Sequence, residues 1–126
     1  NKVLTAAVVF RDENNSVAFI KVEEENLPVF NFASQGQLGQ SVIILGKAIR
    51  VKDVNIFARL GLVSEIDDEI LILDAPFSKE INGAGVFTSS GELLGIARTN
   101  LKNQVFILNP DILSKLLNDY LGASKP

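Results

Sequence analysis

The side chains that carry out most protein chemistry are scarce in this sequence. Its 126 residues include neither histidine nor cysteine. A Ser-His-Asp triad, a Cys-His dyad and a histidine-ligated zinc site are therefore excluded within the chain. The remaining cluster of interest is acidic and comprises Asp67, Asp68, Glu69 and Asp74. Carboxylates in turns and strands are usually solvated, so we predict no metal site, with metal binding or acid–base catalysis as the weaker alternative.

Small residues gather in the stretch 74–97. Gly83 and Gly85 predict a sharp bend or a close approach of two backbones, because glycine has no Cβ atom. Asn82 followed by Gly83 is a common turn dipeptide, so Asn82 is open to a purely geometric interpretation. Gly91 suits the left-handed position of a hairpin turn. This stretch therefore predicts a glycine-rich loop followed by a β-hairpin.

Apolar runs between polar turns predict short strands along most of the chain. We expect them at residues 3–10, 17–22, 41–46, 54–66, 69–73, 86–87, 93–96 and 104–108, with a bulge or bend at Gly61. Asn109 as N-cap, Pro110 in the first turn and an apolar face at helical spacing predict one helix over residues 110–121, stopped by Gly122. This pattern is typical of an antiparallel barrel or sandwich.

The composition narrows the possible partners. The net charge is −3 and no basic cluster stands out, which argues against nucleic acid. No apolar run reaches the roughly 18–20 residues of a membrane span. Apolar residues make up 47% of the chain, as expected for one globular domain with a core of ordinary size.

Five segments, taken in order, resemble trypsin-like serine proteases of the HtrA/Deg type. From Asp74-Ala75 to Gly91-Glu92-Leu93-Leu94-Gly95-Ile96 the chain is similar, without a gap, to the family's nucleophile loop and the hairpin after it. Residues 15–22 resemble the family's aspartate-bearing strand, and residues 39–46 resemble a strand bounded by glycines. Residues 61–64 resemble its Gly-Ile-Val-Ser segment, and residues 104–121 resemble its closing strand and helix.

The resemblance implies an all-β fold, an antiparallel trypsin-like β-barrel with one C-terminal helix. The chain would be a single trypsin-like domain over residues 1–126. We expect a remnant of the first barrel at 1–32, a complete second barrel at 33–108 and the helix at 109–122. The first-barrel strands that carry the family's catalytic histidine are expected to be missing, as is a PDZ domain.

By the same resemblance the family's catalytic positions fall on unsuitable residues. The nucleophile position falls on Asn82, the orienting aspartate on Ser16, and the glycine whose amide helps to form the oxyanion hole on Glu80. Asparagine has no ionisable nucleophile, and a glutamate would oppose an oxyanion. The resemblance thus implies a pseudoprotease without catalytic residues, metal or cofactor.

In this family substrates lie as an added strand along the segment after the nucleophile hairpin, here residues 97–100 beside 79–83. The expected peptide-binding residues are Lys79, Glu80, Ile81, Asn82, Gly83, Ala97, Arg98 and Thr99. The expected partner is a protein or an extended peptide, in an extracytoplasmic compartment by resemblance; the sequence leaves the oligomeric state open. Two alternatives stand: an endopeptidase-related enzyme completed by upstream sequence or a partner chain, and a purely structural domain.

Overall fold

The computed structural model describes residues 3–49 and 51–123, which form two compact units. One unit comprises Asn1–Val29 with Leu116–Pro126, and the other comprises Phe30–Lys115. Each unit has its own sheet, and the two are described separately below. In the described part of the chain, no helix has the length and apolar character needed to cross a membrane.

The smaller unit is a β-hairpin that packs against the last turns of the helix. Its strands, β1 (Ala6–Asp12) and β2 (Val17–Val22), pair antiparallel. The rings of Phe10 and Phe19 stack with centroids 5.1 Å apart, and Tyr120 from the helix lies 6.0 and 5.9 Å from them. Since a two-stranded hairpin is marginally stable alone, this aromatic trio supplies the packing that it needs.

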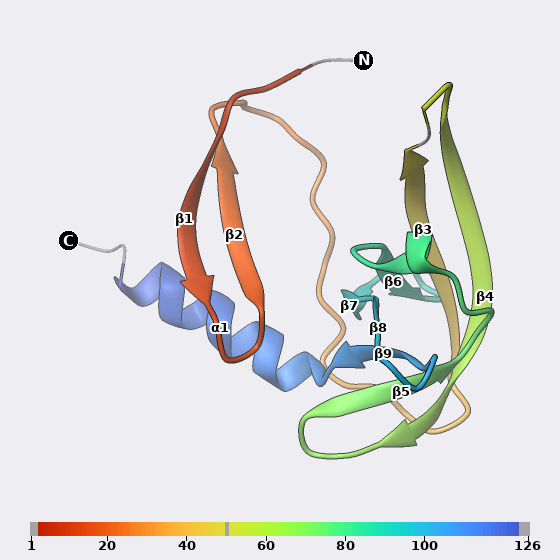
Figure 1. Cartoon of the computed structure of the whole chain (residues 1–126). Coiled ribbons are helices and arrows are strands. Elements are labelled where there is room, and N and C mark those ends of the chain that lie inside the picture. The colour runs from red at the N-terminus through yellow and green to blue at the C-terminus, as the bar shows by residue number, and fades with distance from the viewer. Residues whose placement is uncertain (1–2, 50, 124–126) are drawn as a thin grey trace. The chain divides into compact units, whose positions relative to one another are not determined.

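The larger unit contains one antiparallel seven-stranded sheet in the order β7-β6-β3-β4-β5-β9-β8 (Figure 1). Its strands are β3 (Ser41–Ile49), β4 (Val54–Ile66), β5 (Ile70–Asp74), β6 (Gly85–Thr88), β7 (Leu93–Ile96), β8 (Arg98–Thr99) and β9 (Val105–Leu108). The two end strands, β7 and β8, are consecutive in the chain and are separated only by Ala97. The sheet therefore curls into a nearly closed barrel, which decides between the barrel and the sandwich.

The barrel interior is filled by alternate side chains of the strands. Its fully buried aliphatic residues include Val42, Ile44, Val63, Leu71, Val86, Leu94, Val105 and Ile107. Successive strand residues point to opposite faces, so these positions recur at a spacing of two. Their branched side chains explain why the sequence forms strands here.

Several predicted boundaries differ from the observed ones. Strand β1 begins at Ala6 rather than at residue 3, because its pairing with β2 ends where Ala6 meets Val22. Strand β3 runs to Ile49 rather than to residue 46, because β4 pairs with it as far as Val54. The helix α1 (Pro110–Ala123) continues through Gly122, whose backbone is not left-handed.

The bulge that was predicted at Gly61 lies further along the strand. The register of β4 against β5 shifts between Val63 and Glu65, so the bulge lies after Gly61. A Cβ atom at Gly61 would lie 2.7 Å from the carbonyl oxygen of Asp74. The glycine is thus required by a close approach of two backbones, which is one of the usual reasons for a glycine within a strand.

Candidate functional site

The loop between β5 and β6 contains a single turn of 3₁₀ helix, η1 (Lys79–Ile81). Ser78 is its N-cap: the Ser78 hydroxyl accepts a hydrogen bond of 3.2 Å from the Glu80 N–H. The Ile81 N–H donates to the Ser78 carbonyl at 3.2 Å, and the Asn82 N–H donates to the Lys79 carbonyl at 3.3 Å. The Ile81 side chain is buried in the core and anchors the turn. The amides of Glu80, Ile81 and Asn82 therefore bond within the loop.

The side chain of Asn82 ties this loop to strand β8. Its amide nitrogen donates to the Thr99 hydroxyl at 2.8 Å and to the Lys79 carbonyl at 3.1 Å. Its amide oxygen accepts from the Thr99 N–H at 2.9 Å. We call the paired contacts between Asn82 and Thr99 the Asn82–Thr99 clasp. It joins residues that are 17 positions apart in the sequence.

The backbone next to the clasp continues the pairing. The Gly83 N–H donates to the Ala97 carbonyl at 2.9 Å, and the Ala97 N–H donates to the Ala84 carbonyl at 2.8 Å. Gly83 has a φ of 88°, a left-handed conformation that explains the glycine. Residues 82–84 thus lie along the side of β8 that faces away from β9, and they use its outward groups at Ala97 and Thr99.

The structure brings most of the expected peptide-binding residues together. Lys79, Asn82, Gly83, Ala97 and Thr99 are linked by the hydrogen bonds just described. Their neighbours differ in setting: Ile81 is buried, Glu80 is exposed and Arg98 is half-buried. Partial burial lowers the pKa of the Arg98 guanidinium from its ordinary value, because burial disfavours the charged form.

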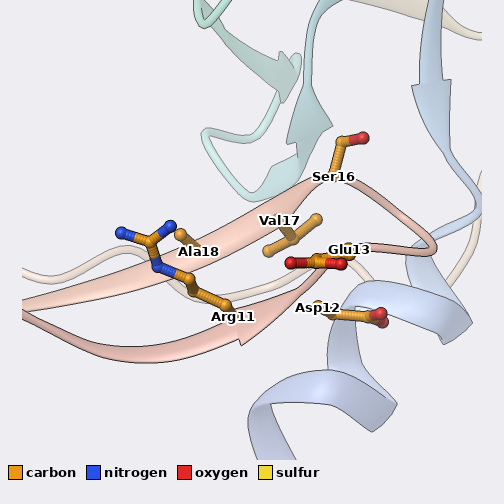
Figure 2. A pocket seen from close by; sticks show the side chains of 6 residues that line it. All are labelled: Arg11, Asp12, Glu13, Ser16, Val17 and Ala18. Atoms are coloured by element: carbon orange, nitrogen blue, oxygen red, sulfur yellow. The ribbon is translucent and has the colours of Figure 1, made fainter.

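Ser16 belongs to the hairpin unit and lies in the turn before β2 rather than on a strand. Its φ is 53° and its N–H donates to the Glu13 carbonyl at 3.3 Å, which closes the turn. A hollow of about 380 Å³ borders this turn, lined by Arg11, Asp12, Glu13, Ser16, Val17 and Ala18. The Ser16 hydroxyl points away from the carboxylates of Asp12 and Glu13 (Figure 2).

Turn geometry explains Asp67, the first residue of the acidic cluster. The Asp67 carboxylate accepts hydrogen bonds from the N–H groups of Ile70 at 2.7 Å and Glu69 at 2.8 Å. These two bonds lower the pKa of the Asp67 carboxyl, Ile70 having the larger effect. Among residues 3–49 and 51–123, no three acidic side chains lie close enough together to hold a metal ion.

Sequence reasoning missed one residue of the loop, Ser78, and the pairing of Asn82 with Thr99, which is itself among the expected peptide-binding residues. Ser78 caps η1, and a serine two residues before Glu80 was an available signal for a cap. The Thr99 hydroxyl completes the clasp, but its partner is distant in sequence and no local pattern indicates the pairing.

No family model matches the sequence, and the search of curated proteins finds no match. Solved structures do resemble the fold. A serine-to-alanine mutant of Rv3671c from M. tuberculosis H37Rv, in an inactive form, is 21% identical over 98% of this chain and 67% of its own, with a TM-score of 0.77. The MamO protease domain from Magnetospirillum magneticum, in its apo form, is 22% identical over 89% of this chain and 67% of its own, with a TM-score of 0.74. With the nearly closed antiparallel barrel and the C-terminal helix, these likenesses confirm that the chain has a trypsin-like fold.

Proposed function

We propose that this chain is a catalytically inactive trypsin-like domain that binds an extended segment of another protein beside Asn82. The observation that carries the proposal is the Asn82–Thr99 clasp. It places a non-nucleophilic side chain where the sequence resembles a nucleophile loop. It also occupies the backbone where the resemblance puts a substrate strand.

The chemistry of the loop supports inactivity. Acyl transfer needs a nucleophile, a base and free amides directed at the developing oxyanion. Asn82 supplies no nucleophile, and the chain has no histidine as base. The amides of Glu80 and Asn82 donate to Ser78 and Lys79 within the 3₁₀ turn, so neither is directed at a substrate carbonyl.

The form of the clasp supports peptide binding. A carboxamide side chain offers the same donor and acceptor groups as a peptide bond. The Asn82 amide oxygen accepts from the Thr99 N–H as the carbonyl of a neighbouring strand would, and its amide nitrogen donates to the Thr99 hydroxyl. An extended peptide can replace Asn82 at the Thr99 N–H by exchanging one amide for another. Such exchanges cost little, because each hydrogen bond contributes a net of only about 0.5–1.5 kcal/mol.

The test is to incubate the domain with unfolded casein and to follow both by intact mass and size-exclusion chromatography. We expect intact casein that elutes with the domain. New casein fragments would contradict inactivity. Intact casein that elutes alone would contradict general peptide binding and favour a structural role.

A second measurement separates the two halves of the proposal. A fluorophosphonate probe, which forms a covalent adduct with activated serines, is expected to leave the mass of the domain unchanged. The variant Asn82→Ser is expected to behave in the same way, because it restores a hydroxyl without a base or free oxyanion amides. An adduct at a defined side chain of the unchanged domain would overturn the inactivity alone. An adduct in the Asn82→Ser variant only would overturn the argument that the loop lacks a base and free oxyanion amides.

A further inference from the structure

The hairpin of β3 and β4 leaves a long strand edge without a partner strand. Strand β5 pairs with β4 only from Leu62 onward, where Leu62 meets Asp74. Within the part of the chain that the structure describes, residues 54–61 pair with β3 alone. We call residues 54–61 the open β4 edge; Figure 1 shows the hairpin extending from the sheet at this point.

The edges at the two ends of the sheet are covered. The backbone at Asn31 and Ala33 bonds to Leu93 of β7 at 2.8 and 2.9 Å. Residues 82–84 cover β8 through the Asn82–Thr99 clasp and its neighbours. Protein sheets usually protect their edges in this way, because an exposed edge is a template for another strand. The open β4 edge stands apart from this pattern.

The main chain of the open β4 edge is directed outward at every second residue. The N–H and C=O of Val63 bond to Gln40 and Gly39 on the β3 side. Since the direction alternates along an antiparallel strand and the β3–β4 register is continuous, Ile56, Ala58 and Leu60 direct theirs to the open side. The Ala58 carbonyl accepts from the Arg59 guanidinium at 3.2 Å. The outward groups of Ile56 and Leu60 have no partner strand among the described residues.

The side chains of the same residues make the adjoining face apolar. This apolar hairpin face consists of Leu45, Ile49, Val54, Ile56 and Leu60, and it also carries Lys47, which is paired with Ile56. Ile56 and Leu60 are 77% and 74% exposed. A groove of about 400 Å³ borders Ile56, and a hollow of about 530 Å³ lies where Leu60 meets Asp74, Ala75 and Pro76. An added strand would therefore find both backbone partners and apolar contacts here.

The charge of the β3–β4 hairpin indicates which kind of segment would bind at the open β4 edge. Residues 46–61 include four basic residues and one acidic residue, although the whole chain has a net charge of −3. Arg59 lies on the edge itself, with its guanidinium 4.9 Å from the centroid of the Phe57 ring. A second copy of the chain would bring like charges together, whereas an acidic segment would attract them. Arg59 is also the side chain that an acidic residue would draw away from the Ala58 carbonyl.

We infer that the open β4 edge binds an extended segment of a partner protein in which apolar and acidic residues alternate. The segment adds to the sheet as a strand beside β4. Its apolar side chains lie along the apolar hairpin face, and its carboxylates lie on the opposite face beside Arg59. This site is separate from the clasp at β8, so it stands or falls independently of the proposed function.

The experiment uses the whole chain and a seven-residue peptide of alternating valine and glutamate, blocked at both ends. Amide hydrogen exchange is followed by NMR. At saturating peptide we expect exchange at Ile56 and Leu60 to slow at least tenfold. Exchange at Asn55 and Phe57 should change little, because those N–H groups already face β3. Slower exchange at Thr99 instead would place the peptide at β8 and overturn the inference.

Matched variants and a matched peptide complete the test. Leu60→Lys should weaken binding at least tenfold, whereas Leu38→Lys, at a loop residue that is 68% exposed, should not. A peptide of alternating valine and lysine should bind at least tenfold more weakly than the glutamate peptide. Equal binding of both peptides would overturn the charge argument. A dimer of the chain alone, with Ile56 and Leu60 already protected, would assign the edge to a second copy and overturn the inference.

Discussion

The side-chain amide of Asn82 contacts both the η1 turn and strand β8, so replacing this side chain is expected to affect both. The amide holds the η1 turn through Lys79 and holds β8 through Thr99. An alanine at this position would lose both contacts at once, while the Gly83 and Ala97 backbone bonds would remain. The residue therefore couples the shape of the loop to the availability of the Thr99 N–H.

We predict that Asn82→Ala lowers the free energy of unfolding by about 1–2 kcal/mol and raises the affinity for an extended peptide at β8 by up to about tenfold. The affinity rises because a peptide no longer has to displace a side chain from Thr99. Urea denaturation measures the first effect and fluorescence anisotropy of a labelled casein peptide measures the second. Asn100→Ala is the control, since the Asn100 side chain bonds to the Lys102 and Gln104 amides but not to Thr99. An equal gain in affinity in both variants would contradict the role of the clasp.

Asp67 supports a prediction about pH. The N–H groups of Ile70 and Glu69 hold the pKa of its carboxyl below the ordinary 3.8. A carboxyl whose folded pKa is lowered stabilises the fold fully above the unfolded value and loses this contribution as pH falls through the folded value. Asp67→Ala should therefore lower the Tm at neutral pH, and the difference from the wild type should narrow below pH 3.8.

Thermal denaturation across this pH range checks the prediction. Asp68→Ala removes a neighbouring charge without removing either hydrogen bond, so we expect a smaller change in Tm. A difference between Asp67→Ala and the wild type that widens as the pH falls would show that the two backbone bonds are not its source.

At the scale of elements, β4 joins two parts of the sheet, because it pairs with β3 on one side and with β5 on the other. It is the longest strand, pairs with β3 along nine residues and supports β5 at its far end. Gly61 lies where the support of β5 begins, close to the Asp74 carbonyl and the Ala75 side chain. Close packing at this point sets the distance between β4 and the chain leaving β5.

We predict that Gly61→Ala lowers the free energy of unfolding by about 1–3 kcal/mol, because a backbone atom 2.7 Å from the new Cβ has to move. Urea denaturation measures the change. Gly122→Ala is the matched control: nothing lies within 4 Å of its Cβ position, and alanine is favoured in a helix. A loss of stability at Gly122 equal to that at Gly61 would contradict the close-approach argument.

Elements were predictable from sequence where the pattern is local. The bounds of β2 and β4 agree with the predicted ones because turn residues flank both apolar runs. The extension of β3 to Ile49 was not predictable from its own residues, because it depends on how far β4 runs beside it. The clasp was missed for a related reason: Asn82 and Thr99 meet only once the barrel has curled.

At the scale of the whole molecule, two units share one helix. Strands β3 to β9 form a barrel with a continuous buried core. Among the described residues, the hairpin of β1 and β2 has no fully buried side chain, and its ring contacts are those of the aromatic trio with Tyr120. Regions with few buried contacts open at a lower free energy than the rest of a protein. The two units are thus expected to differ in local stability.

We predict that Tyr120→Ala speeds amide exchange in β1 and β2 by at least about tenfold, which corresponds to 1.4 kcal/mol, and leaves the core amides of β5 and β9 nearly unchanged. Hydrogen exchange followed by mass spectrometry resolves the two units. Tyr120→Phe keeps the ring and should behave like the wild type. Equal acceleration in both units would mean that the molecule opens as one cooperative whole.

The Asn82–Thr99 clasp also bears on the chemical ageing of the protein. An asparagine followed by glycine deamidates readily, because the glycine nitrogen can attack the side-chain carbonyl with little hindrance. Here the Asn82 amide is held by three hydrogen bonds, and the Gly83 N–H is committed to the Ala97 carbonyl. The same contacts that close the β8 edge therefore slow the conversion of Asn82 to aspartate. A ligand that opened the clasp would expose this dipeptide to the reaction. The extent of deamidation at Asn82 would then increase with the time that a molecule had spent with the clasp open.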